Sequence, residues 1–247
     1  MSEGFIRYAD VHKSFAGGPV LKGVDLAIAR GESVVILGGS GSGKSVLLRH
    51  TIALHRPDRG EVWVDGVEIS GLSEDELQET RKKVGMLFQA GALFDSMSVY
   101  DNVAFPLHEH TDWPEEQVGA RVAEVLGFVE LEDVEDRMPS DLSGGMRKRV
   151  ALARAIALAP QAVLYDEPTT GLDPITANAI NRLIRGLQKR LGITSVVVTH
   201  DIQSAFHVAD RIAFLYEGRI LFEGTVQEAQ ETREPLLREF LRGGVDA

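Results

Sequence analysis

The chain has 247 residues, of which 44% are hydrophobic and 26% are charged, as is typical of a folded protein with a substantial core. It contains no cysteine, which excludes a disulfide scaffold and a thiolate metal site. The formal net charge is −11, and an acidic surface repels nucleic acid and anionic lipid headgroups. We therefore expect no nucleic-acid partner.

We also expect neither a signal peptide nor a membrane span. The first ten residues lack the basic and apolar blocks of a secretion signal. No apolar run approaches the roughly 20 residues that a membrane helix needs, and the nearest stretch, 150–165, is interrupted by Arg154 and Pro160. If the protein acts at a membrane, another protein must hold it there.

Short buried strands organise the predicted fold. Each is an apolar run without polar alternation, as parallel strands covered on both faces require. In chain order these runs are residues 33–37, 84–88, 162–165 and 195–199. Helix-like stretches such as 46–54 and 147–159 separate them, which predicts a parallel α/β sheet with helical crossovers.

Other segments predict further elements. Residues 23–28 and 61–69 alternate polar and apolar side chains, as in a small antiparallel side sheet, and residues 212–222 resemble a hairpin. Residues 90–159 carry several helical stretches and no clear strand. They predict a helical subdomain inserted into the sheet domain.

A polar group follows each buried strand. The first strand runs into a glycine loop, and the others run into Gln89, the pair Asp166-Glu167, and His200. Ligands of open α/β sheets bind beyond the carboxyl ends of the strands, so these groups predict one converging site.

The glycine loop, residues 38–45, fits the phosphate-binding pattern G-x-x-x-x-G-K-[ST]. Its backbone N–H groups can turn inward to cradle phosphate oxygens, and the helix that follows points its positive end at them. Lys44 supplies a positive charge to the β- and γ-phosphates, and the Ser45 hydroxyl binds magnesium. The predicted ATP-binding residues of this loop are Gly38, Gly39, Ser40, Gly41, Ser42, Gly43, Lys44, Ser45 and Val46. The alternative is a flexible Gly/Ser loop.

The pair Asp166-Glu167 predicts the chemical step. Two adjacent carboxylates at a strand end are unfavourable unless a cation is present. We expect Asp166 to hold magnesium, directly or through water, and Glu167 to polarise the attacking water as general base. The alternative is a solvated acidic turn.

Residues 142–146, Leu-Ser-Gly-Gly-Met, precede a strong helix that ends at Pro160. This is a second helix start able to take phosphate, and one ATP does not need two such cradles. The Ser143 loop is therefore expected to serve the nucleotide of another subunit, in a two-fold dimer that holds two ATPs.

This set of motifs resembles the ATP-binding-cassette (ABC) ATPases over about residues 5–224. The resemblance implies an ATPase with a RecA-like mixed-sheet core, an antiparallel side sheet and an inserted helical subdomain. Within one domain over 1–247, it implies a nucleotide-binding core over 1–89 and 160–224, the helical subdomain over 90–159, and a C-terminal helix and tail over 225–247.

The resemblance also implies roles for single residues. Phe15 would stack on adenine, and Gln89 would sense magnesium and couple to a membrane partner. Asp173 would communicate across the dimer, and His200 would contact the γ-phosphate as a catalytic group beside Lys44 and Glu167. The family signature is matched by Ser143, Gly144 and Gly145, with Met146 where Gln is usual, and Val46 stands where Thr often follows. Neither departure removes an assigned chemical group.

Residues 89–107, together with 142–149, 166–174 and 200–206, are similar to the ATPases of Mla-type, MCE-associated lipid transporters. That family implies two permease subunits above an ATPase homodimer, periplasmic MCE-domain proteins that carry phospholipid, a small cytoplasmic regulatory subunit in some members, and a place on the cytoplasmic side of the bacterial inner membrane. Alternatives are a small-solute importer ATPase and a cell-division ABC protein. A P-loop kinase or GTPase leaves the Ser143 loop unexplained.

Several residues keep a structural alternative. Phe15 could be core packing, His200 a structural histidine and Gln89 an ordinary loop amide. The exposed-looking run 91–94 suits a permease helix but could instead pack within the helical subdomain. The basic run 147–149 is interpreted as a solvated helix face or partner contact, and His108 with His110 lacks the rest of a metal ligand set.

Overall fold

A computed structural model describes residues 4–243. Residues 1–3 and 244–247, which include most of the predicted C-terminal tail, lie outside the described residues. The chain forms two compact units, one from residues up to Arg81 together with those from Thr194 onward, and the other from residues 82–193.

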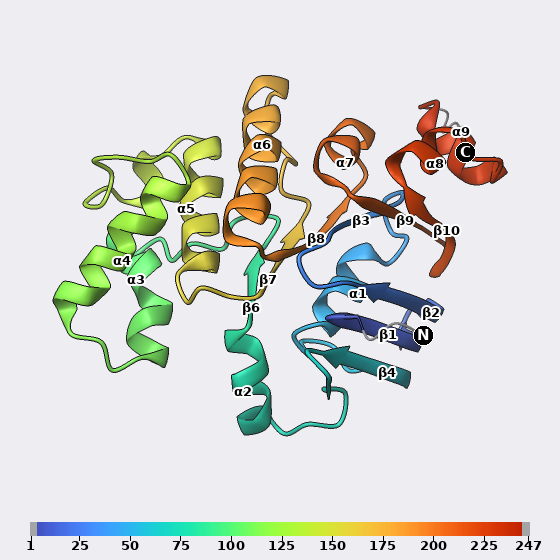
Figure 1. Cartoon of the computed structure of the whole chain (residues 1–247), viewed down its shortest axis with the longest axis horizontal. Coiled ribbons are helices and arrows are strands. Elements are labelled where there is room, and N and C mark those ends of the chain that lie inside the picture. The colour runs from blue at the N-terminus through green and yellow to red at the C-terminus, as the bar shows by residue number, and fades with distance from the viewer. Residues whose placement is uncertain (1–3, 244–247) are drawn as a thin grey trace. The chain divides into compact units, whose positions relative to one another are not determined.

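The first unit contains an antiparallel sheet of order β2-β1-β4-β5 (Figure 1). The side sheet predicted from alternation is thereby confirmed. Its central strand, β1, is bulged between Tyr8 and Val11, where Asp10 has a positive φ of 49°. Its strands are β1 Ile6–Phe15, β2 Gly18–Ile28, β4 Arg59–Val64 and β5 Val67–Glu68.

The same unit contains strands in the order β10-β9-β3-β8. β3 is parallel to β8 and β9, while β9 and β10 form the predicted antiparallel hairpin. Every residue of β3 and β8 is buried, because helices cover these strands. The strands are β3 Ser33–Leu37, β8 Thr194–Thr199, β9 Arg211–Tyr216 and β10 Arg219–Thr225.

Helices of the first unit pack on these strands. α1 packs against β8, and α7 packs against β3 and β8. α8 begins with a capping box, in which Thr225 and Glu228 satisfy each other's backbone N–H groups. The helices are α1 Lys44–His50, α2 Glu74–Lys82, α7 Ile202–Val208, α8 Val226–Gln230 and α9 Pro235–Leu241.

The second unit combines a parallel strand pair with helices. β6 pairs with β7 in parallel register, as predicted, but Gly85 and Met86 in β6 are only half-buried. α5 packs against β6 and against helices α3, α4 and α6. The elements are β6 Val84–Leu87, α3 Val99–His110, α4 Glu115–Phe128, the 3₁₀ turn η1 Pro139–Asp141, α5 Gly144–Ile156, β7 Ala162–Asp166 and α6 Pro174–Leu191.

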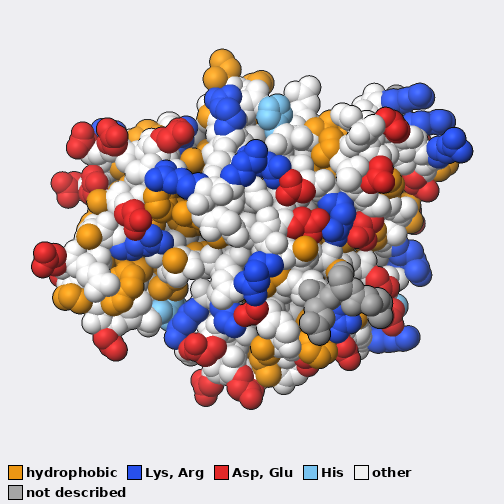
Figure 2. All heavy atoms as spheres, viewed as in Figure 1, with side chains coloured by type: hydrophobic (Ala, Val, Ile, Leu, Met, Phe, Trp, Pro, Cys, Tyr) orange, Lys and Arg blue, Asp and Glu red, His pale blue; other side chains and the backbone are white. Residues whose placement is uncertain are grey.

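The surface is mixed in character. On the face shown in Figure 2, acidic and basic side chains are interspersed, and hydrophobic side chains gather over α3 and α4. Across the part of the chain that the structure describes, no helix combines the length and the apolar character needed to span a bilayer.

Candidate functional site

The phosphate-binding loop connects β3 to α1 (Figure 1). Gly43, the residue before α1, has φ of 104°, and a Cβ there would lie 2.9 Å from Leu21 Cδ2. The left-handed conformation therefore favours glycine, and a larger residue would also have to displace the end of the Leu21 side chain. Within residues 4–243, no side chain caps α1 at this residue, and the start of a helix attracts anionic groups.

Lys44 is folded back over the loop. The side chain is buried, and Nζ donates hydrogen bonds of 2.9 Å to the carbonyl oxygens of Gly38 and Gly39. Ser42 Oγ is also buried, and within the described chain it has no hydrogen-bond partner. A buried hydroxyl without a partner, beside an ammonium group and a glycine turn, fits the oxygens of a phosphate chain.

Two further predicted residues lie in the same unit. Phe15 ends β1, and its side chain is 43% exposed, so it is not part of the core. Its ring meets His55 edge-on with centroids 5.3 Å apart, and Lys13 Nζ lies 5.6 Å from the ring centroid. His200 directly follows β8 and is exposed.

The acidic pair lies at the end of β7 in the second unit. Asp166 is 1% exposed and Glu167 is 8% exposed, so this is not a solvated turn. Glu167 has φ of 49°, an uncommon conformation for a residue other than glycine. Thr170 Oγ1 donates a 3.2 Å hydrogen bond to Glu167 Oε2. A buried carboxylate on strained backbone, as at Glu167, is typical of a functional position.

Gln89 follows β6 closely, and an unpredicted residue holds it. Lys148, from α5, is buried and donates a hydrogen bond to the backbone oxygen of Gln89. Burial lowers the pKa of the Lys148 ammonium, while Asp166 and Glu167 oppose that change. The interpretation of residues 147–149 as a solvated helix face is therefore wrong for Lys148. Periodicity could have found it, since Lys148 lies four residues before the apolar Leu152.

The Ser143 loop lies beside the Asp173 loop. Ser143 Oγ accepts a 3.3 Å hydrogen bond from Met146 N and so caps α5. A Cβ on Gly145 would lie 2.6 Å from Thr176 Cγ2, so the two loops pack closely. Asp173 in turn caps α6 through Ile175 N and Thr176 N, at 3.0 and 3.1 Å. Hydrogen bonding by Thr176 lowers the pKa of Asp173.

The segment after Gln89 shows both predicted behaviours. Phe94 is 41% exposed, yet one side of its ring packs on Phe105, with centroids 5.0 Å apart. The Arg154 guanidinium lies 5.6 Å from the same ring. Leu93 is half-buried. An apolar edge thus remains available at Phe94 while the rest is internal packing.

The predicted residues fall into two groups, one in each unit. The first unit holds Phe15, His200 and the loop from Gly38 to Val46. The second unit holds Gln89, Asp166 and Glu167, which share contact or charge interaction with Lys148, and the Ser143 loop with Asp173.

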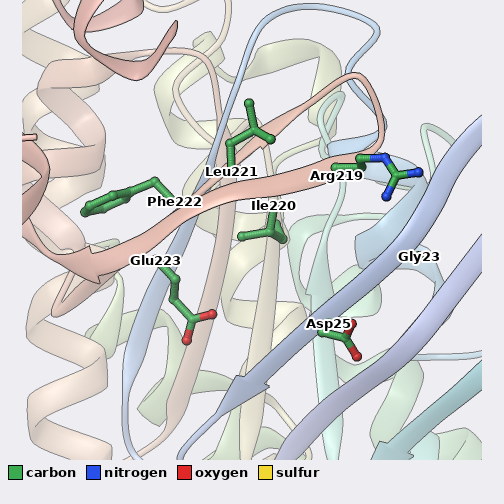
Figure 3. Close-up of a pocket in the computed structure, with 7 residues that line it drawn as sticks. All are labelled: Gly23, Asp25, Arg219, Ile220, Leu221, Phe222 and Glu223. Atoms are coloured by element: carbon green, nitrogen blue, oxygen red, sulfur yellow. The ribbon is translucent and has the colours of Figure 1, made fainter. Parts of the chain in front are cut away.

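Other candidate sites do not involve these residues. A hollow of about 360 Å³ in the first unit lies between β2 and β10 (Figure 3). Its carboxylates are engaged, because Asp25 accepts from Asp10 N at 3.0 Å and Glu223 pairs with Arg211 at 3.1 Å. His108 pairs with Glu115, and the described residues contain no cluster of three or more histidine, aspartate or glutamate side chains suited to a metal.

Comparison with known proteins identifies the family. Residues 21–170 match the family described as ABC transporter. The intermembrane phospholipid transport system ATP-binding protein MlaF of Escherichia coli K12 is 43% identical over 92% of this chain and 84% of that protein. The chloroplastic protein TRIGALACTOSYLDIACYLGLYCEROL 3 of Arabidopsis thaliana is 41% identical over 99% of this chain and 75% of its own length. The probable ribonucleotide transport ATP-binding protein mkl of Mycobacterium tuberculosis is 42% identical over 98% of this chain and 69% of its own length.

Solved structures agree with these relatives. A dimeric post-hydrolysis state of an ATP-binding cassette bound to ADP and Pi superposes with a TM-score of 0.83 at 37% identity, covering 90% of this chain and 98% of that one. The cbiO1 protein of Clostridium perfringens, part of the ABC transporter complex cbiONQ, gives a TM-score of 0.85 at 32% identity. The match covers 98% of this chain and 96% of that one. The chain therefore belongs to the ABC transporter family, as a subunit that binds and hydrolyses ATP.

Proposed function

We propose that the chain hydrolyses magnesium-bound ATP in sites shared between two copies, and that this reaction drives phospholipid transport. One observation carries the shared site. Among the described residues, α1 and α5 both begin at glycine-bearing loops, and it is the loop before α1 that folds a lysine over glycine carbonyls. The start of α5 is instead presented beside the Asp173 loop. A related cassette is dimeric with ADP and Pi, which supports the same assembly here.

The residues take the following roles. The loop from Gly38 to Ser45 and Lys44 bind the phosphates, Phe15 stacks on adenine and His200 contacts the γ-phosphate. Magnesium would be held by oxygen donors, from Ser45, Gln89 and Asp166, and it would neutralise phosphate charge. Glu167 accepts a proton from the attacking water, while Lys44 and His200 stabilise charge on the transferred phosphoryl group. Ser143, Gly144, Gly145 and Asp173 complete the partner's site.

Glu167→Gln tests the general base. The amide is nearly the same size as the carboxylate but cannot accept the proton, so ATP should bind and trap the dimer while hydrolysis falls at least ~100-fold. Single-turnover hydrolysis and the dimer fraction on a sizing column, both with magnesium and ATP, measure this. Asp75→Asn, in exposed α2, is the matched control. Unchanged turnover would remove Glu167 as base.

Mixing two inactive chains tests the sharing. Lys44→Ala removes the lysine of the phosphate loop, and Ser143→Arg blocks the start of α5. A heterodimer of these chains keeps one intact composite site, so mixing should recover part of the ATPase rate. No recovery at any ratio, with heterodimers verified by differential tags, would contradict the shared site.

Phospholipid is the proposed cargo because two relatives carry lipid names. One is named for intermembrane phospholipid transport and the other for trigalactosyldiacylglycerol. The mycobacterial name points to ribonucleotides instead. The exposed edge of Phe94 offers an apolar contact for a permease subunit. We place the homodimer on the cytoplasmic face of a bacterial inner membrane, below permease subunits that work with periplasmic MCE-domain proteins. A small cytoplasmic regulatory subunit is a further proposed partner.

Isolation of the intact membrane complex tests the cargo. We expect affinity purification through this chain to recover a permease and an MCE-domain protein, with phospholipid detected by mass spectrometry. A solute-binding protein, or a division protein with few membrane spans, would overturn phospholipid transport but leave the ATPase assignment in place.

A further inference from the structure

Helix α5 carries two features that face different nucleotides under the proposed function. Its first turn begins at Ser143, which we assign to the ATP of the partner chain. One turn further on, Lys148 donates its hydrogen bond to the backbone oxygen of Gln89, which we assign to the chain's own magnesium. Both features lie in the same compact unit and on one short helix.

The segment around Gln89 is held against α5 at further points. A Cβ on Gly85, in β6, would lie 2.1 Å from the Ala155 carbonyl oxygen, so strand and helix backbones are in direct contact there. Arg154 Nη2 donates a 3.0 Å hydrogen bond to the Gly91 carbonyl oxygen. Residues 85–91 therefore run along α5, and Lys148 binds the Gln89 backbone near the Ser143 end of that helix.

Lys148 also interacts electrostatically with the acidic pair. The side chain is 7% exposed, and its ammonium interacts electrostatically with Asp166 and Glu167. A buried ammonium needs compensating partners, and here they are the Gln89 carbonyl oxygen and these two carboxylates. Removing the ammonium would free the Gln89 backbone and leave the carboxylates without that charge.

We propose that Lys148 is a positioning residue that couples the Gln89 segment of one nucleotide site to the Ser143 helix start of the other. This rests on the shared site proposed above. A shift of Gln89 when magnesium and the γ-phosphate arrive moves Lys148 and with it the first turn of α5. The second site of the dimer thereby responds to occupancy of the first, which is energetic coupling between two sites.

Lys148→Met is the decisive variant, because methionine keeps the aliphatic stem and removes the charge and donor. We expect the Hill coefficient for ATP to fall from above 1 toward 1, and the magnesium concentration for half-maximal rate to rise by roughly 5–100-fold, as typical coupling energies imply. Lys148→Arg keeps a charged donor and should recover most of both. Lys189→Met, at an exposed position late in α6, is the matched control.

The outcomes separate coupling from folding and from the shared site. A merely structural lysine would lower the urea midpoint without changing the Hill coefficient, and that result would overturn the coupling role. If Lys148→Met fails to fold by circular dichroism, Lys148→Ala, which also removes the charge and the donor, is measured in its place with the same expectations. If the wild-type chain hydrolyses ATP with a Hill coefficient of 1, the coupling role falls. The mixing of Lys44→Ala with Ser143→Arg chains then decides separately whether the site is shared.

Discussion

Helices α1 and α5 both begin at glycine-containing loops assigned to phosphate, but the two starts are built differently. α1 follows Gly43, whose positive φ turns the backbone, and within residues 4–243 no side chain caps it. α5 is capped by the Ser143 hydroxyl, and Gly145 packs closely against Thr176. The start of α1 is therefore a glycine turn without a side-chain cap, whereas the start of α5 is capped by its own Ser143.

The basic side chains that follow these starts differ in the same way. His50, at the end of α1, is 1% exposed; its Nδ1 donates to the Val46 carbonyl oxygen at 2.7 Å, and Nε2 has no partner among the described residues. Lys148 in α5 donates a hydrogen bond to the Gln89 backbone oxygen, and the charges of Asp166 and Glu167 favour its ammonium form. Thus α1 is anchored by a buried neutral ring, and α5 by a buried cation with acidic partners.

The largest expected effect follows from His50. Burial lowers its pKa to about 4 from 6.5, so the unfolded chain binds this proton more readily than the folded chain. Above pH 6.5 the ring is neutral in both states, and the stability that goes with the neutral ring is fully present. As the pH falls from 6.5 toward 4, protonation of the unfolded chain lowers the free energy of unfolding by about 3 kcal/mol in total. Urea unfolding of wild type and His50→Gln between pH 7.5 and 4 should show a flatter profile for the variant.

Matched substitution at an exposed histidine controls this comparison. His207→Gln, on the exposed face of α7, should keep the wild-type slope, because carboxylates titrate equally in both proteins. Parallel profiles for His50→Gln and wild type would show that α1 is not anchored by a neutral imidazole. The contrast between a neutral ring in α1 and a buried cation in α5 would then fail.

Gly43 and Gly144 provide a second contrast, because alanine at Gly43 should cost about 1–3 kcal/mol of ATP-binding free energy. Alanine at Gly43 would have to adopt φ of 104° and would meet Leu21 Cδ2 at 2.9 Å, so Gly43→Ala should weaken ATP binding roughly 5–100-fold. Alanine at Gly144 would meet Leu172 Cδ2 at 3.5 Å, an ordinary contact. Titration of dilute chain with a fluorescent ATP analogue should show near-wild-type affinity for Gly144→Ala. Equal losses would mean that both loops bind the same nucleotide.

Much of this fold was predictable because its buried strands are unbroken apolar runs. β3, β7 and β8 each appear in the sequence as such a run, and the polar group after each one marks a strand end. The phosphate loop was predictable for a different reason, since its glycines and Lys44 have fixed spacing. The sequence could not show that Glu167 sits at φ of 49°, because backbone strain depends on surrounding packing.

The missed features depend on contacts between distant segments. β1 was not predicted, because its bulge at Asp10 breaks the alternation of Ile6, Tyr8 and Val11. The helical spacing of Lys148, Leu152 and Ile156 is consistent with burial of Lys148, but its partner, a backbone oxygen at Gln89, leaves no trace in the sequence. The ends of α6, by contrast, are marked locally in the sequence by Asp173 as N-cap, Pro174 at the first position and Gly192 at the end.

The smallest effect separates two roles of Ser143 at the start of α5. Ser143→Ala removes the cap on Met146 N and should lower the free energy of unfolding by about 1 kcal/mol, while reducing the ATPase rate. Ser143→Asp restores a capping oxygen and places a negative charge at the positive end of α5, so stability should return. The same charge would repel a γ-phosphate, so the ATPase rate should fall further than in Ser143→Ala. Wild-type turnover in Ser143→Asp would mean that no phosphate binds at the start of α5. Ser143 would then contribute to helix stability alone, unlike the phosphate-binding loop before α1.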